Sequence, residues 1–152
     1  MIVGVISDTH GLLRPEALDA LWGSDLILHA GDVGKPEVLE TLRAIAPTTA
    51  IRGNVDTAVW ATALPATEVV SVDGLELYML HDRAALDLDP RAAGFAAVIY
   101  GHTHRPEAAV RHGVLYLNPG SAGPRRFALP VTVARLTLSG GQLSHEIIDL
   151  AI

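Results

Sequence analysis

The segment Tyr-Gly-His-Thr-His at residues 100–104 places two imidazole side chains one residue apart, directly after an apolar run. In an extended chain, residues i and i+2 point to the same side and lie about 6.6 Å apart along the backbone. Asp8 and His10 have the same spacing and also follow an apolar run. Imidazole nitrogens and carboxylate oxygens are common ligands of divalent metals, so both pairs are candidate ligand pairs.

Further side chains of ligand type follow other apolar runs, which gives seven candidates: Asp8, His10, Asp32, Asn54, His81, His102 and His104. Such a mixed nitrogen and oxygen set suits Mn²⁺, Fe²⁺, Zn²⁺, Ni²⁺ or Co²⁺ rather than Ca²⁺. One catalytic zinc usually has three protein ligands. Seven residues, with one carboxylate bridging, would instead give two neighbouring metals four protein ligands each.

Each candidate taken alone has a simpler role in a turn or in the core, and only their joint occurrence favours a metal site. The remaining polar residues near these segments are assigned structural roles. We expect Asp56 to fix its loop through backbone hydrogen bonds and Arg52 to pair with a carboxylate. Three histidines are assigned to loops or the core: His29, His112 and His145.

Alternating strand and helix patterns would position the first of these side chains. Short apolar runs at residues 2–7, 25–30 and 48–52 predict buried parallel strands. The intervening segments 14–23 and 35–46 each have a proline near their start, and they predict helices. Strand–helix–strand units on this spacing predict a parallel sheet with helices packed against it.

The second half of the chain has a hairpin pattern instead. Tight-turn dipeptides divide three strand-like segments: Asp73-Gly74 in 67–80, His112-Gly113 in 106–118 and Gly140-Gly141 in 131–150. A short helix at 90–94 and a strand at 96–100 are predicted between the first two segments. The sequence therefore predicts one α/β domain over residues 1–152, with two β-sheets packed face to face and flanked by helices. Ligands bind at the carboxyl ends of strands in such sheets, so the polar loops should meet at one rim.

Composition excludes several classes of protein. The chain has 152 residues, of which 49% are apolar, enough for one domain with a real core. It has no cysteine, which excludes disulfides and thiolate chemistry. The formal net charge of −6 argues against a nucleic-acid partner, and no apolar stretch is long enough to span a membrane. We expect a soluble cytoplasmic protein; apolar strand faces in the last hairpin could support a homo-oligomer.

The motifs together resemble the calcineurin-like metallophosphoesterase superfamily, and most of all its compact bacterial and archaeal phosphodiesterase branch. They occur in the order D-T-H (8–10), G-D (31–32), G-N-x-D (53–56), H (81), G-H-T-H (101–104) and a closing N-P-G-S…P-R (118–126). The resemblance implies a four-layer α/β/β/α sandwich of two mixed β-sheets. It assigns Asp8, His10, Asp32 and His104 to one metal and Asp32, Asn54, His81 and His102 to the other. Asp32 would be the bridge.

Two positions depart from the family pattern. Larger members have a histidine after the Gly-Asn pair, assigned as general acid for the leaving group, and here that position is Val55. This departure favours substrates with good leaving groups. The residue after the metal-binding histidine is often glycine in this branch, and here it is Asp82. Its carboxylate could orient His81 or crowd the second metal.

The resemblance implies a dinuclear phosphodiesterase that hydrolyses a small phosphodiester through a hydroxide bridging two divalent metals, with manganese favoured. Catalytic roles are expected for Asp32, Asn54 and His102, and contacts to the substrate phosphate for Asn54, Arg125 and Arg126. Metal loss is expected below about pH 6, because imidazole must be neutral to bind metal. Two alternatives stay open: a phosphomonoesterase using the same site, and a non-catalytic scaffold of this fold that binds partner proteins.

Overall fold

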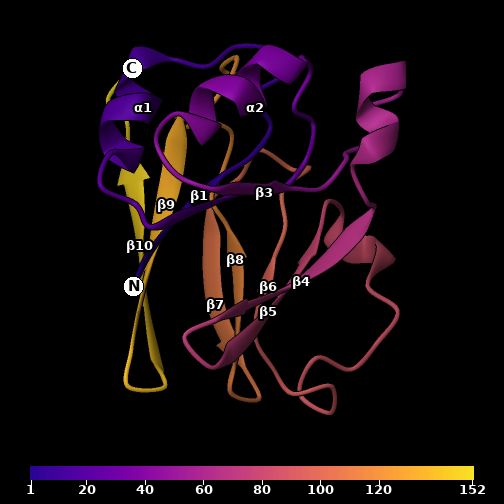
Figure 1. The fold of residues 1–152 in the computed structure, drawn as a ribbon, viewed down its shortest axis with the longest axis vertical. Helices are drawn as coiled ribbons and strands as arrows, with labels where there is room; N and C mark the ends of the chain where they lie inside the picture. The colour runs from indigo at the N-terminus through magenta and orange to yellow at the C-terminus, as the bar shows by residue number, and fades with distance from the viewer.

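Ten strands form two five-stranded sheets in the computed structural model, which describes residues 1–152 (Figure 1). In spatial order, the first sheet contains β10 (Gln142–Asp149), β9 (Thr132–Ser139), β1 (Ile2–Ile6), β2 (Leu26–His29) and β3 (Thr48–Ala50). The second sheet contains β4 (Thr67–Val72), β5 (Leu75–Leu80), β6 (Phe95–Ile99), β8 (Val114–Asn118) and β7 (Glu107–Arg111). The predicted fold class is confirmed.

The first sheet is mixed, as its sequence pattern predicts. Strands β1, β2 and β3 run parallel, and the hairpin β9–β10 joins them antiparallel to β1. Helices α1 (Pro15–Leu21) and α2 (Pro36–Arg43) both begin at the predicted proline and pack against the outer face of this sheet. Both are a few residues shorter than predicted. The longer one, α2, has eight residues, so neither α-helix could span a bilayer.

The second sheet contains two of the predicted hairpins. Strand β4 pairs antiparallel with β5, and β7 pairs antiparallel with β8, while β5, β6 and β8 run parallel. All three predicted turns have positive φ at both central residues, for example 49° at Asp73 and 78° at Gly74. That backbone matches the right-handed twist of the paired strands, which explains why these dipeptides close hairpins.

The main core lies between the two sheets. Alternate residues of each strand point into it, such as Val3 and Val5 from β1 and Leu77 and Met79 from β5. Because the sheets are packed face to face, the carboxyl ends of β1, β2, β3, β5, β6 and β8 can meet at one end of the molecule.

The outer face of the second sheet has a thinner cover than the first. The segment from the 3₁₀ turn η2 (Arg83–Ala85) to β6 packs Leu86, Leu88 and Phe95 over this face. The predicted helix at 90–94 is wrong, because these residues form turns in which the Asp89 side chain accepts from two backbone N–H groups. The segment has room for barely one helical turn before β6 begins. A second 3₁₀ turn, η1 (Val59–Ala63), was not predicted.

Candidate metal centre

Nitrogen and oxygen donors from five loops gather at the end of the sheets where the parallel strands finish. They form two clusters, in each of which one ligand atom per residue lies within 4.8 Å of the others. The first cluster is Asp8, His10 and His104, and the second cluster is Asp32, His81 and His102. The seventh candidate, Asn54, lies beside the second cluster, with its Oδ1 at 3.2 Å from His102 Nδ1. The structure thus brings all seven predicted side chains together.

Tight loop backbone makes this convergence possible. Positive φ, between 46° and 74°, is shared by Asp8, His10, Asp32, His102 and His104, in the left-handed region that residues other than glycine adopt in only a few per cent of cases. Strained backbone of this kind persists only where the surrounding structure imposes it, and it is concentrated at functional sites.

Glycines let the loops pack closely. A Cβ on Gly53 would overlap the Asp32 side chain, and one on Gly101 would overlap Ser7 and Asp8. At Gly31, a Cβ would lie 2.7 Å from His81 Nδ1. Each of these glycines therefore permits the approach of a loop that carries a donor.

Asp8 is the most deeply buried donor, with no exposed surface. Its Oδ2 accepts hydrogen bonds from Ser7 Oγ at 2.7 Å and from the His102 backbone N–H at 3.1 Å. Its Oδ1 has no hydrogen-bond partner and lies 3.4 Å from His104 Nε2 and 3.8 Å from His10 Nε2. Burial alone would raise the pKa of Asp8, but its contacts with His10, His104 and neighbouring groups together hold that pKa far below the usual range.

Asp32 and His81 form the fixed part of the second cluster. Asp32 Oδ1 accepts from the Val55 backbone N–H at 3.0 Å, and its Oδ2 lies 3.2 Å from His81 Nε2 and 3.7 Å from His10 Nε2. The Asp32 carboxylate is therefore positioned between the two clusters. His81 Nδ1 donates to the Ala30 carbonyl at 2.7 Å, which leaves the lone pair of the neutral ring on Nε2, facing the carboxylates.

Charges in the centre shift the pKa values of both its histidines and its carboxylates. Asp8 is the main cause of a raised pKa at His10. Burial opposes protonation of His81, but Asp32, the Ala30 carbonyl and Asp8 outweigh it and raise its pKa above the ordinary value. Burial likewise opposes ionisation of Asp32, yet His81 and the Val55 N–H lower its pKa. The carboxylates are thus ionised at neutral pH.

The donor set fits divalent metal ions. Asp8 Oδ1 and His81 Nε2 are buried, lack hydrogen-bond partners and face each other at 3.8 Å. Buried polar atoms are normally paired, so two such atoms within a group of carboxylates and imidazoles indicate a cation between them. No thiolate or lysine is part of either cluster, which agrees with the metals predicted from the sequence.

Asp82 does not have the role of orienting His81, because the Ala30 carbonyl takes that place. The side chain of Asp82 turns toward the second cluster from the other side, where its Oδ2 lies 3.9 Å from His102 Nε2. Its Oδ1 accepts from the Ala84 backbone N–H at 3.0 Å, at the start of η2. This turn sets the direction of the carboxylate.

His29, which the sequence assigns to a loop or the core, is a positioning residue. Its Nδ1 accepts from the Gly31 backbone N–H at 3.1 Å, so its Nε2 carries the proton and donates to Thr9 Oγ1 at 2.9 Å. The Thr9 hydroxyl in turn donates to the Val33 carbonyl at 2.9 Å. This chain ties the loop of Asp8 and His10 to the loop of Asp32. Burial lowers the pKa of His29 to about 4 and keeps it neutral.

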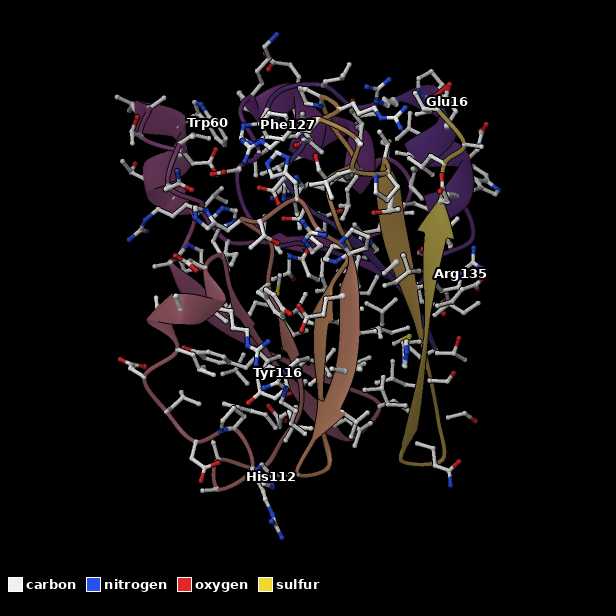
Figure 2. The ribbon with its side chains drawn as sticks, turned by 180° about the vertical axis from the view of Figure 1, so that it is seen from behind. Glu16, Trp60, His112, Tyr116, Phe127 and Arg135 are labelled. Carbon is white, nitrogen blue, oxygen red and sulfur yellow. The ribbon has the colours of Figure 1, made fainter.

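Two other structural assignments were tested by the structure. Asp56 fixes its loop as predicted, since its carboxylate accepts from the backbone N–H groups of Val33, Gly34 and Gly53. Arg52 was predicted to pair with a carboxylate, and this is wrong, because its Nη1 donates to the Leu64 carbonyl. His112 lies in the turn at the far end of β8 from the clusters (Figure 2).

Two cavities adjoin the clusters from different sides. The Tyr78 cavity, of about 440 Å³, reaches the second cluster and is lined by Arg52, Gly53, Asn54, Ala66, Thr67, Tyr78, Leu80, His81, Asp82, Ala85, Asp87 and His102. The arginine cavity, of about 340 Å³, reaches the first cluster and is lined by His10, His104, Pro124, Arg125 and Arg126. The structure thus places both predicted arginines beside the first cluster.

Fold and donor set together define a metallophosphoesterase-type protein. The model of the calcineurin-like phosphoesterase superfamily domain matches residues 1–141, and the chain belongs to this superfamily. The chain is 34% identical over 160 residues to a probable metallophosphoesterase from Methanothermobacter thermautotrophicus, covering 97% of this chain and 92% of the relative.

Solved structures agree on the fold. The structure of a novel archaeal phosphodiesterase superposes with a TM-score of 0.81 and 22% identity, covering 97% of this chain and 100% of that one. At this identity the likeness shows the fold alone. Wild-type Vps29 from Entamoeba histolytica, solved in complex with Zn²⁺, superposes with a TM-score of 0.77 and 25% identity, covering 99% of each chain.

Proposed function

We propose that the protein is a metal-dependent phosphodiesterase that hydrolyses a small phosphodiester with two divalent metals, for which manganese is favoured. The observation that carries this proposal is the position of the clusters between two separate cavities that share no lining residue. A phosphate at the clusters has room for a substituent on each side. A phosphomonoester would need only one of these spaces.

The residues that would hold the metals follow from the two clusters. Asp8, His10, Asp32 and His104 would bind one ion, and Asp32, Asn54, His81 and His102 the other. Bound divalent metals supply positive charge for the phosphoryl oxygens and lower the pKa of water toward neutrality. The position of the Asp32 carboxylate between His10 and His81 supports Asp32 as the ligand that both ions would share.

In the reaction, a water oxygen forms a bond to phosphorus, one ester P–O bond breaks, and the departing oxygen gains a proton. Asn54 and His102 line the Tyr78 cavity, so their side chains are placed to contact the phosphate or the leaving group. The Val55 side chain supplies no acid, and its backbone N–H serves to fix Asp32. A leaving group that is stable as an anion is therefore expected to react fastest.

Parallel assays with two substrates test the proposal. Purified protein stripped of metal and reloaded with Mn²⁺ is given bis(4-nitrophenyl) phosphate and, separately, 4-nitrophenyl phosphate, with Asp32→Ala and His102→Ala as inactive controls. We expect the diester to be hydrolysed with the higher kcat/KM and chelator to abolish the reaction. Faster hydrolysis of the monoester would establish the phosphomonoesterase alternative.

A non-catalytic scaffold is the second candidate function, and the likeness to Vps29 is the observation in its favour. The complete set of seven donors favours an enzyme, because a protein that only binds a partner would not need them. Protein that takes up two equivalents of metal but hydrolyses neither substrate would support the scaffold.

A further inference from the structure

The two cavities differ in charge, and this difference bears on the substrate of the proposed phosphodiesterase. We propose that the substrate is an unsymmetrical phosphodiester. The arm in the arginine cavity carries an additional anionic group, a phosphate or a carboxylate, while the leaving arm in the Tyr78 cavity is uncharged and partly apolar. This inference rests on the proposed function and specifies its substrate class.

The arginine cavity offers positive charge, and no carboxylate side chain lines it. Besides Arg125 and Arg126, it is lined by two histidines of the first cluster and by Pro124. Neither arginine pairs with a carboxylate side chain, and the one hydrogen bond formed by their side chains runs from Arg125 Nη1 to the main-chain oxygen of Ile152. Each guanidinium has five N–H donors in a planar fork that matches phosphate and carboxylate oxygens.

The Tyr78 cavity has the opposite character. Asp82 and Asp87 contribute two carboxylates, and Arg52, its one cation, already donates to the Leu64 carbonyl. Tyr78 and Leu80 add hydrophobic side chains to this cavity, whereas the arginine cavity is lined only by histidine, arginine and proline. An anionic group here would meet the Asp82 carboxylate next to His102, so like-charge repulsion disfavours it.

Each cavity adjoins a different cluster, so each would receive one arm of the phosphodiester. The arginine cavity touches His10 and His104 of the first cluster, whereas the Tyr78 cavity touches His81 and His102 of the second. Phe127, which directly follows Arg126 in the sequence, marks the position of the arginine segment. It lies at the end of the molecule where the parallel strands finish (Figure 2). A phosphate spanning both clusters would therefore extend one arm over the arginines and the other into the Tyr78 cavity.

Two diesters that differ in one charge test this inference. Both have 4-nitrophenol as the leaving group; the second arm is phenyl in one and 4-carboxyphenyl in the other. At low ionic strength, we expect the Mn²⁺-loaded protein to favour the carboxylated diester by roughly fivefold in kcat/KM, since exposed charge pairs give modest energies. The preference should shrink toward unity at about 0.5 M salt.

Variants assign the preference to the arginines. In Arg125→Gln and Arg126→Gln, the ratio of the two kcat/KM values should fall toward one, whatever happens to the individual rates. Arg111→Gln, which removes an exposed positive charge from β7 and lines neither cavity, should keep the wild-type ratio. The matching phosphinates, in which carbon replaces both ester oxygens, should show the same difference in calorimetric binding without turnover.

The outcomes separate this inference from the proposed function. Hydrolysis of both diesters at equal kcat/KM, or a preference that survives in both arginine variants, overturns the anionic arm and leaves the phosphodiesterase intact. A preference for the neutral diester does the same. Failure to hydrolyse either diester overturns the phosphodiesterase and the inference with it.

Discussion

The first and second clusters contain the same kinds of donor but differ in how firmly the protein holds them. Asp8 and His104 of the first cluster are buried, whereas the His102 side chain of the second is 42% exposed. Asn54 beside it is also exposed. Each cluster therefore has two buried donors and one partly exposed histidine, and the more exposed of these two histidines, together with Asn54, lies in the second cluster at the edge of the Tyr78 cavity.

The difference has a structural cause. The loops of the first cluster are joined by hydrogen bonds, since the His102 backbone N–H and Ser7 Oγ both bind Asp8 Oδ2. In the second cluster, Asp32 and His81 are likewise held by the Val55 N–H and the Ala30 carbonyl. The His102 ring and the Asn54 amide, however, contact each other, and His102 approaches the Asp82 carboxylate, with no backbone hydrogen bond to either side chain. Preorganised ligands lose less entropy on binding. We therefore expect the first cluster to bind its metal more tightly and the second to exchange its metal.

Asp32 links the two clusters, so its replacement should have the largest effect. Asp32→Asn keeps the size of the side chain but removes the charge that His10 and His81 both face. We expect kcat/KM to fall by at least about 100-fold, beyond the loss typical of residues that only orient a ligand. Both metal-binding steps should weaken, as measured by metal analysis after dialysis. Asp89→Asn, whose carboxylate accepts two backbone N–H groups in a remote turn, is the matched control. Weakening of one step alone would show that Asp32 belongs to a single cluster.

The order of affinity can be tested by removing one histidine from each cluster. His104→Ala should weaken the tighter of the two binding steps, and His102→Ala should weaken only the looser one, each by roughly tenfold or more. Competition against a metal-sensing dye resolves the two steps. If His102→Ala weakens the tighter step more than His104→Ala does, the first cluster is not the tighter metal site.

The convergence of the donors was predictable because each one closely follows a short apolar segment that can be recognised in the sequence. Asp8, Asp32 and His81 each follow a recognisable apolar strand, and parallel strands end at one rim. The hairpin turns were predictable for a similar reason, since Asp73-Gly74 and its counterparts suit the backbone that closes a hairpin.

Other features depend on contacts that the sequence pattern does not contain. His29 looks like any strand histidine, and its role arises from Thr9 and Gly31 lying on either side of it in the folded chain. The direction of Asp82 is decided by the η2 turn that follows it. The segment 90–94 has helix-forming residues but too little length before β6, so tertiary position overrides local propensity there.

His29→Leu should loosen both clusters, because His29 ties the loop of the first to that of the second. The substitution leaves the buried Thr9 hydroxyl and the Gly31 N–H without these partners. We expect the free energy of unfolding to fall by about 2 kcal/mol. Metal affinity should fall about tenfold at both steps. Urea denaturation and metal titration measure these effects. His29→Gln, which keeps an acceptor and a donor, should recover part of the loss, and partial recovery of affinity distinguishes positioning from simple packing.

The pH dependence should differ between metal-free and metal-loaded protein. The folded-state pKa values of His10 and His81 are raised by the nearby carboxylates, so their contribution to stability is present below the unfolded value of 6.5 and is lost as pH rises through the folded values. Metal-free protein should therefore lose stability as the pH rises above the ordinary imidazole value of 6.5, as urea denaturation would show. Bound metal replaces these protons, and the loss should disappear. Metal binding at neutral pH should also release protons. As the pH is lowered, metal affinity should begin to fall at a pH above the value of about 6 expected for an ordinary imidazole. Equal pH profiles with and without metal would contradict this account.

The smallest expected effect concerns Asp82, which belongs to neither cluster but faces His102 of the second cluster. Its carboxylate Oδ2 is 3.9 Å from His102 Nε2 and the side chain is 46% exposed, so solvent screens its charge. Asp82→Asn keeps the oxygen that accepts from the Ala84 N–H and removes only the charge. We expect the looser metal step to weaken by about two- to threefold at low salt, and the tighter step to stay unchanged. If the carboxylate instead crowds the second metal, the substitution would strengthen that step, and the direction of the change decides between the two roles.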